Sequence, residues 1–289
     1  MPEGDTVWLA AKRMHEALAG RVLTSSDFRV PQLATTDLAG RVVREVVPRG
    51  KHLLTRLSAE GGHAGLTLHT HFRMDGTWHL YRPGDRWRGG PAWQVRVVLE
   101  NAEWQAVGYR LPVVELLETA DEAEVVGHLG PDVLSDDWDA DEAVRRLLAD
   151  PEREIGMALL DQRNLAGLGN LYRTEVLFLR GLTPWTPVGD VSDLAALVEK
   201  GRRLMLANRG HWEQSTTGSL RRGEHHWVFE RTGQPCRRCG TRIVTAEQGA
   251  APRARLSYWC PRCQLGPAAT PVQAAARRDR PVGRTRYPP

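Results

Sequence analysis

The sequence predicts an α+β protein of several units, because its residue pattern changes character twice along the chain. Short β-rich runs separated by Gly, Pro and Asp fill residues 21–110, and acidic helical segments follow. Two Cys-x-x-Cys pairs then lie near the C-terminal end. Short strands at this spacing are typical of a sandwich or a barrel. We therefore expect a β-sandwich or barrel with a leading helix, then a helical unit, then a small zinc-ribbon hairpin.

Length and composition exclude several classes of protein. The chain has 289 residues, of which 41% are hydrophobic and 26% are charged, so we expect an ordinary globular protein of about two domains or more. No stretch approaches the roughly 18 apolar residues that a membrane span needs. The N-terminal residues lack the basic and apolar regions of a secretory signal. We therefore expect a cytoplasmic protein with no membrane contact, in which the cysteines stay reduced.

The net charge of +4 conceals an uneven distribution. Residues 1–200 carry 22 Lys and Arg against 30 Asp and Glu, whereas residues 201–264 carry 12 against 4. A polyanion such as nucleic acid would bind most readily at this basic end. Solvated arginines on an ordinary surface remain the alternative.

The elements follow from periodicity and from the residues that end each run. A helix is expected over 5–19, with Asp5 as its N-cap and Gly20 after its end. Strands are expected at Arg41–Val47, His52–Leu57, Leu66–His71, Thr77–Tyr81, Trp93–Leu99 and Trp104–Tyr109. Helices are expected at Asp139–Ala149, Glu152–Asp161, Leu171–Arg180 and Asp190–Ala207. Residues 265–289 contain five Pro and five Arg, and we expect them to be disordered.

The cysteines give the most specific spacing in the chain. Cys236 and Cys239 are separated by two residues, as are Cys260 and Cys263, and twenty residues lie between the pairs. Two such knuckles supply the four thiolates of a tetrahedral zinc site. With four protein ligands the metal has no open position, so one structural Zn²⁺ is expected. Between the knuckles, Arg253 and Arg255 would project from a two-stranded ribbon, either as phosphate ligands or as solvated surface residues.

A glycine-rich segment, residues 160–170, lies between two expected helices. It resembles half of a dinucleotide fingerprint, but it follows a helix rather than a strand, and Tyr172 occupies the third glycine position. Its glycines and Asn170 could instead direct backbone N–H groups and the Asn side chain at an anion such as a DNA phosphate. A plain packing corner between helices is the alternative.

Two further features are weak when taken alone. Removal of Met1 would leave Pro2 with a free amine, which is a Schiff-base nucleophile, and the neighbouring Glu3 could donate a proton. Residues 48–52 form a basic turn in which Lys51 could hold a phosphate, or which could be an exposed hairpin turn.

Together these features resemble the formamidopyrimidine-DNA glycosylase/endonuclease VIII family, and most closely its actinobacterial Nei-type branch. The resemblance covers residues 1 to about 264. The segments that carry it are Met1-Pro2-Glu3-Gly4-Asp5, Arg49-Gly50-Lys51-His52-Leu53, His128-Leu129-Gly130-Pro131-Asp132, Asp161 to Tyr172, and Arg255-Leu256-Ser257-Tyr258-Trp259-Cys260. The family fold implies a two-layer β-sandwich at 1–130, a helix–two-turn–helix unit at 131–229, and a zinc finger at 230–264.

The resemblance implies a bifunctional DNA glycosylase and AP lyase of base excision repair. Pro2 would be the nucleophile, Glu3 the general acid, and Lys51 a phosphate ligand needed for strand cleavage. Asn170 and Arg255 would contact phosphates of double-stranded DNA that carries damaged bases or abasic sites. Met74 lies near the family's wedge position, with burial in the core as the alternative. A monomer is expected.

Two questions stay open at this point. The short stretch Ser219–Gln234 favours oxidised pyrimidines as substrates, whereas the turn Arg73–Gly76 is more similar to the purine-lesion branch. A non-catalytic zinc-containing DNA-binding protein on the same fold is the alternative function.

Overall fold

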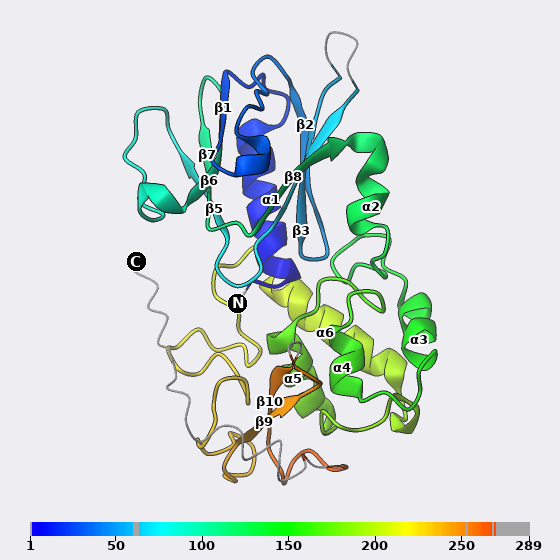
Figure 1. The fold of residues 1–289 in the computed structure, drawn as a ribbon. Helices are drawn as coiled ribbons and strands as arrows, with labels where there is room; N and C mark the ends of the chain where they lie inside the picture. Colours follow the sequence, from blue (N-terminus) through cyan, green and yellow to red (C-terminus); the bar gives the residue numbers. More distant parts are fainter. Residues whose placement is uncertain (1, 60–63, 252–253, 268, 270–289) are drawn as a thin grey trace.

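The computed structural model describes residues 2–59, 64–251, 254–267 and 269. The helices are α1 (Gly4–Leu18), α2 (Glu122–Val126), α3 (Ala140–Leu148), α4 (Ile155–Leu160), α5 (Asn170–Arg180) and α6 (Leu194–Asn208) (Figure 1). The strands are β1 (Ser25–Phe28), β2 (Val43–Arg49), β3 (His52–Leu57), β4 (Leu66–His71), β5 (Thr77–Tyr81), β6 (Val95–Glu100), β7 (Gln105–Tyr109), β8 (Val113–Glu118), β9 (Val244–Gln248) and β10 (Arg255–Trp259).

The N-terminal half is a β-sandwich with a helix in its core. One antiparallel sheet has the order β1-β6-β7-β5 and the other has the order β2-β3-β4-β8. Apolar residues of both sheets pack in one cluster with Val7, Ala11 and Met14 of α1. The first turn of α1 extends beyond the sandwich toward the lower part of the molecule (Figure 1). The sandwich of the two alternatives is therefore confirmed, and the barrel is not.

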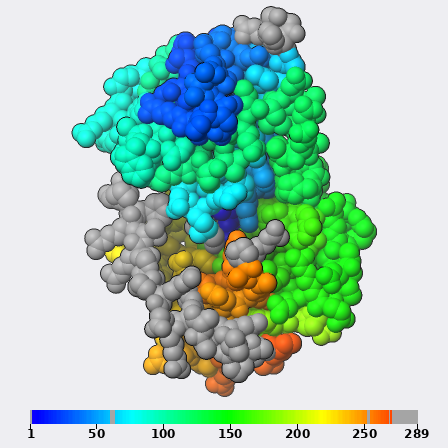
Figure 2. Space-filling view, in the orientation of Figure 1, coloured from blue at the N-terminus to red at the C-terminus, as the bar shows by residue number. Residues whose placement is uncertain are grey.

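The C-terminal half has its own core, in which helices and the ribbon share side chains. Leu171, Tyr172 and Phe178 of α5 pack in one cluster with Cys236, Tyr258 and Cys260. Strands β9 and β10 pair as an antiparallel hairpin. In Figure 2 the blue-to-cyan sandwich lies above the green helical unit and the orange ribbon. Among the described residues, no helix is long and apolar enough to cross a membrane.

Most expected elements lie within a few residues of their observed bounds, but one cap is wrong. Helix α1 begins at Gly4 with Glu3 at its N-cap, so Asp5 lies inside the first turn. Asp5 accepts hydrogen bonds from a distant side chain instead, because Tyr172 Oη lies 2.5 Å from its Oδ2. By contrast, Asp139 does cap α3, since its side chain accepts a hydrogen bond from the backbone of Glu142.

Three short elements were not expected from the sequence. Strand β1 is only four residues long and largely polar, β8 lacks a clear apolar alternation, and α2 has five residues. The two strands owe their conformation to tertiary contact, since β1 pairs with β6 and β8 pairs with β4. Helix α2 is joined to the sheet through Glu122, which accepts hydrogen bonds from Arg56. The tail expected to be disordered lies outside the described residues at position 268 and from residue 270 onward.

Candidate active site

The N-terminus is held against the glycine-rich segment that precedes α5. The backbone N–H of Gly4 donates to the carbonyl of Gly167 at 2.9 Å. A Cβ atom on Gly4 would lie 3.0 Å from the Cα of Gly167, so the two backbones touch without side chains between them. Gly167 itself has φ +100°, a conformation that L side chains rarely adopt. These glycines therefore allow the N-terminal residues to pack directly against the helical unit.

Glu3 is buried at this junction and its carboxylate is held by backbone donors. The N–H of Gly169 donates to Oε2 at 2.8 Å, and the N–H of Leu171 donates to Oε1 at 2.6 Å. Burial raises the pKa of Glu3, although the charge of Lys51 and these two donors oppose the shift. The expectation that these N–H groups bind an external anion is therefore wrong for Gly169 and Leu171, because both donate to the carboxyl group of Glu3. A carboxyl held in this way is suited to general acid chemistry.

Lys51 lies on the β2–β3 turn and reaches the same segment. Its Nζ donates to the carbonyl of Leu168 at 2.8 Å. Burial lowers the pKa of Lys51, the Glu3 charge raises it, and the Arg255 charge lowers it. The structure thus brings Glu3, Lys51 and the start of α5 together.

The turn that carries Lys51 is fixed by a buried carboxylate. Gly50 has φ +58°, and its N–H donates to Asp132 Oδ2 at 2.6 Å. Asp132 also accepts from the N–H of Leu134, and its burial raises the pKa of its carboxyl. A Cβ on Gly50 would lie 2.9 Å from the Cβ of Ala166. The close contact with Ala166 and the left-handed backbone conformation therefore both require glycine at position 50.

Asn170 and the ribbon meet over a buried arginine. Asn170 Nδ2 donates to the carbonyl of Leu256 at 3.0 Å, and Asn170 Oδ1 accepts from Arg173. Arg173 is fully buried, donates to Gln248 and Ser257, and has a pKa that burial lowers to about 9. These bonds fix the start of α5 to the strand that begins with Arg255.

The expected DNA ligands differ in how the structure places them. Arg255 is exposed at the start of β10, and its charge acts on both Lys51 and Arg173. Met74 is 58% exposed in the turn after β4, so burial in the core is wrong as its explanation. It lines a cavity together with Arg73, Arg96 and Arg110. Arg253 lies outside the described residues.

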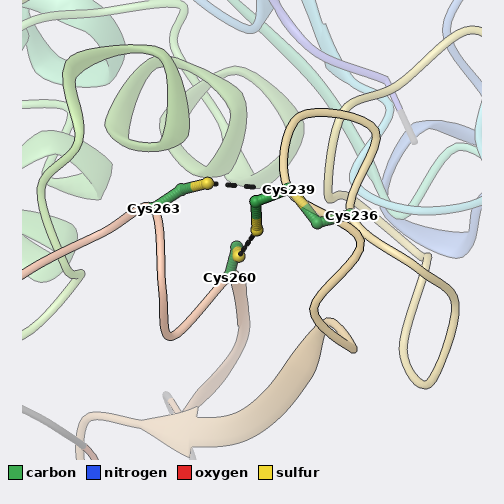
Figure 3. Close-up of side chains that lie close together, drawn as sticks. All are labelled: Cys236, Cys239, Cys260 and Cys263. Atoms are coloured by element: carbon green, nitrogen blue, oxygen red, sulfur yellow. Dashed lines mark hydrogen bonds between the residues drawn. The ribbon is translucent and has the colours of Figure 1, made fainter.

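The four cysteines converge as their spacing predicts (Figure 3). All four Sγ atoms lie within 4.8 Å of one another, and none of the four forms a disulfide. The Sγ atoms of Cys239 and Cys260 are 3.4 Å apart, and those of Cys236 and Cys263 are 3.9 Å apart. A tetrahedral zinc with four thiolates has sulfurs about 3.8 Å apart, so the donor set and its spacing fit Zn²⁺.

Two features of this site were not found from the sequence. The glycine-rich segment was expected to bind an anion, but the contact of Gly169 with Glu3 was not expected. Gly169 has an ordinary φ, but a Cβ there would lie 2.5 Å from Glu3 Cδ, so the close approach rather than the backbone requires glycine. Arg173 carries no signal in one sequence, because a helical arginine is usually read as solvated.

Comparisons with known proteins agree over nearly the whole chain. Residues 1–111 match the formamidopyrimidine-DNA glycosylase N-terminal domain, residues 129–205 match the formamidopyrimidine-DNA glycosylase H2TH domain, and residues 233–265 match the zinc finger found in FPG and IleRS. A Streptomyces coelicolor protein named probable endonuclease 8 2 is 58% identical over 97% of this chain and 100% of its own length. The Mycolicibacterium smegmatis DNA-(apurinic or apyrimidinic site) lyase Nei2 is 42% identical over 91% of this chain and 99% of its own length.

Solved structures share the fold at lower identity. A complex of Lactococcus lactis Fpg with DNA containing an abasic site gives a TM-score of 0.74 at 22% identity, covering 92% of this chain and 100% of that chain. The chain has a sandwich, a helical unit and a cysteine ribbon in this order, and each of them lies in a region that matches one of these domains. The chain belongs to the formamidopyrimidine-DNA glycosylase/endonuclease VIII family.

Proposed function

We propose that this protein is a bifunctional DNA glycosylase and AP lyase of base excision repair, which removes oxidised bases and cleaves the strand at the resulting site. The observation that carries the proposal is the buried Glu3 beside Pro2, held by two backbone donors and facing the charge of Lys51. The relatives named endonuclease 8 2 and Nei2 support it.

Base release uses the amine of Pro2 after removal of Met1. The damaged nucleotide leaves the stack, and the Pro2 nitrogen attacks C1′ of its sugar while the bond from C1′ to the base breaks. Glu3 donates a proton at or near the sugar, and its raised pKa keeps that proton available. The amine proton of Pro2 leaves with the base. The C1′–O4′ bond then breaks as O4′ takes the proton from Glu3, and the product is an iminium between Pro2 and C1′ of the opened sugar.

Strand cleavage follows from the same intermediate. The iminium acidifies the C2′ proton, whose loss leads to departure of the 3′ phosphate and then of the 5′ phosphate. Lys51 holds the phosphate beside the reacting sugar. Within the described part of the chain its Nζ donates to the carbonyl of Leu168, and an ammonium carries three donors.

Double-stranded DNA lies across the junction of the sandwich and the helical unit. Asn170, Arg255 and Arg253 contact phosphates, and Met74 enters the space that the displaced nucleotide leaves. The exposure of the Met74 side chain and the arginines that line the same cavity support this role of Met74. Oxidised pyrimidines are the preferred bases, which the short segment Ser219–Gln234 favours.

The metal has a structural role in this proposal. One Zn²⁺ is held by Cys236, Cys239, Cys260 and Cys263, and it fixes the two knuckles that position β9 and β10. The protein acts as a monomer. Its substrate is chromosomal DNA, so it would work in the bacterial cytoplasm, at the nucleoid.

Reductive trapping tests the proposal directly. Borohydride should reduce the iminium and join the protein covalently to a duplex that contains an abasic site. Pro2→Gly, which makes the amine primary and more mobile, should greatly slow base release while duplex affinity stays nearly unchanged. DNA binding without any trapped complex would favour the non-catalytic alternative, and full lyase activity in Pro2→Gly would identify another nucleophile.

A further inference from the structure

A row of histidines lies beside Lys51 on the outer face of the sheet β2-β3-β4-β8. His52 of β3 pairs in register with His71 of β4, and His69 of β4 pairs with Glu115 of β8. The rings of His52 and His71 are 4.7 Å apart in an edge-to-face arrangement, and those of His52 and His69 are 5.0 Å apart and stacked. The mechanism above uses none of these imidazoles.

Hydrogen bonds join three of these side chains in series. His69 Nδ1 lies 2.9 Å from Glu115 Oε2, and His69 Nε2 lies 2.8 Å from His52 Nδ1. His69 is buried, whereas the Glu115 side chain is 54% exposed. The row therefore connects the solvent side of β8 with the imidazole next to Lys51.

The chemistry of the donors fixes how a proton can be placed in the row. A carboxylate only accepts, so His69 Nδ1 donates to Glu115. If His69 carries one proton, its Nε2 accepts from His52 Nδ1, and His52 Nε2 is then an acceptor. When one proton is added at His52 Nε2, the His52 Nδ1 proton can move to His69 Nε2 and the bond between the two rings reverses. His52 then stays neutral with Nε2 as a donor, and His69 carries the charge.

Several charges around His52 and His71 govern this exchange. Burial, together with the charge of Lys51 and neighbouring imidazoles, lowers the pKa of His52 to about 3 and that of His71 to about 4. The other groups that face His52 are the imidazoles of His69 and His128, and Arg49 is its register partner on β2. Arg73 acts on His71. A phosphate beside Lys51 would bring the opposite charge to these imidazoles and favour their protonation.

We propose that Glu115, His69 and His52 form a proton relay through which the protein takes up a proton when a DNA phosphate binds beside Lys51. The proton binds His52 Nε2 on the side of Lys51, and the His52 Nδ1 proton passes to His69 Nε2. His52 Nε2 thus changes from a hydrogen-bond acceptor to a donor, and the positive charge lies on His69 beside Glu115. Glu115 and His69 act as positioning residues for that donor. This inference rests on the proposed phosphate site at Lys51.

The test measures how affinity changes with pH, using a duplex that contains a tetrahydrofuran abasic analogue, which the lyase cannot cleave. At fixed ionic strength, uptake of one proton strengthens binding about tenfold for each pH unit of acidification. The wild-type protein should show a slope toward this limit between about pH 8 and about pH 6, and calorimetry in two buffers of different ionisation enthalpy should report the same proton uptake.

Matched variants identify the route. Glu115→Gln keeps an oxygen that can accept from His69 but removes the charge, and it should lose most of the slope. Glu118→Gln removes an equal charge from the same strand and should retain the wild-type slope. His69→Phe, which breaks the row, should behave as Glu115→Gln does. If His69→Phe does not fold, the comparison of the two glutamine variants on β8 still decides.

The outcomes separate this inference from the function on which it rests. Equal slopes in Glu115→Gln and Glu118→Gln would overturn the relay, even if borohydride trapping succeeds. A wild-type protein that is not trapped would overturn the proposed lyase, whatever the slopes are. Proton uptake on DNA binding should be smaller in Lys51→Ala than in the wild-type protein, and equal uptake in the two proteins would also contradict the relay.

Discussion

The N-terminal site joins Glu3 to Gly169, which are 166 positions apart, whereas the paired sulfurs of Cys236 and Cys263 are 27 positions apart. The site exists only where the sandwich and the helical unit touch. The four thiolates come from one short segment, although the ribbon also shares a core with α5. Chemistry at the N-terminus thus depends on docking of two large units, whereas the cysteine cluster depends on local ligation.

The largest effect should come from a methyl group placed at that docking surface. Gly169→Ala puts a Cβ 2.5 Å from Glu3 Cδ and displaces the carboxylate from its two backbone donors. We expect base release to slow about 100-fold, because misplacement of a reacting group by about 1 Å has this effect. Single-turnover assays of base release measure it.

The control for this variant is Gly201→Ala on α6. Its Cβ would contact only the flexible end of Leu168 at 3.0 Å, and alanine favours helices. It should release bases at nearly the wild-type rate. A wild-type rate in Gly169→Ala would show that Glu3 does not need its two backbone hydrogen bonds.

Cys236→Ser tests the other half of the comparison. We expect it to bind zinc weakly and to lose more than tenfold in DNA affinity, because the ribbon that carries Arg255 loosens. The N-terminal sandwich should stay folded, since its core shares no side chain with the cysteines. Zinc content, duplex affinity and limited proteolysis report these three properties. A metal-free variant with full DNA affinity would contradict the structural role of the ribbon.

Lys51 and Arg255 separate rate from affinity across the two regions. Lys51→Ala should lower single-turnover cleavage roughly tenfold even at saturating protein, because the lysine holds the phosphate during elimination. Arg255→Ala should instead weaken binding and lower the salt slope by about one counterion. Cleavage by Lys51→Ala at the wild-type rate would return Lys51 to an ordinary turn residue.

Lys51→Arg serves as the charge control for this pair. It keeps the positive charge but replaces a compact ammonium with a planar fork. Retention of affinity with loss of rate would show that the shape of the group at Lys51 matters, in addition to its charge.

The same contrast explains what one sequence can predict. Local spacing was enough for the cysteine cluster and for the turn at residues 48–52, since both depend on neighbouring residues. Pro2, Glu3 and Lys51 were found by resemblance, but the two donors that hold Glu3 were not, because nothing in a sequence records a contact over 166 positions. Asp5 was assigned to a helix cap on local grounds, and its actual partners are Tyr172 and Gln214.

Short elements show the same limit. Strand β8 supplies Glu115 to the histidine row. Its apolar and polar residues do not alternate clearly, so its strand conformation depends on pairing with β4. The histidine row could not be predicted either, because His52, His69 and Glu115 meet through the register of three strands. Register is a property of the whole sheet.

The smallest expected effect is on stability, and it should come from the histidine side of the comparison, because residues 230–264 contain no histidine. The pKa of His52 is lowered from 6.5 to about 3 in the folded protein. Below the ordinary histidine pKa the unfolded chain therefore binds a proton that the folded protein does not, and stability falls as the pH drops through this window. Buried carboxyls with raised pKa values, such as Glu3, act in the opposite direction.

His52→Gln removes this acid-linked loss while retaining a side chain that can hydrogen-bond to His69. Between about pH 6 and about pH 4, its free energy of unfolding should fall less steeply than that of the wild-type protein, by at most about 1.4 kcal/mol per pH unit. Urea unfolding at several pH values measures the slope. His211→Gln is the control, since His211 is exposed in the segment after α6, and this variant should leave the slope unchanged. Parallel curves for His52→Gln and the wild-type protein would show that His52 does not stay neutral in the folded state.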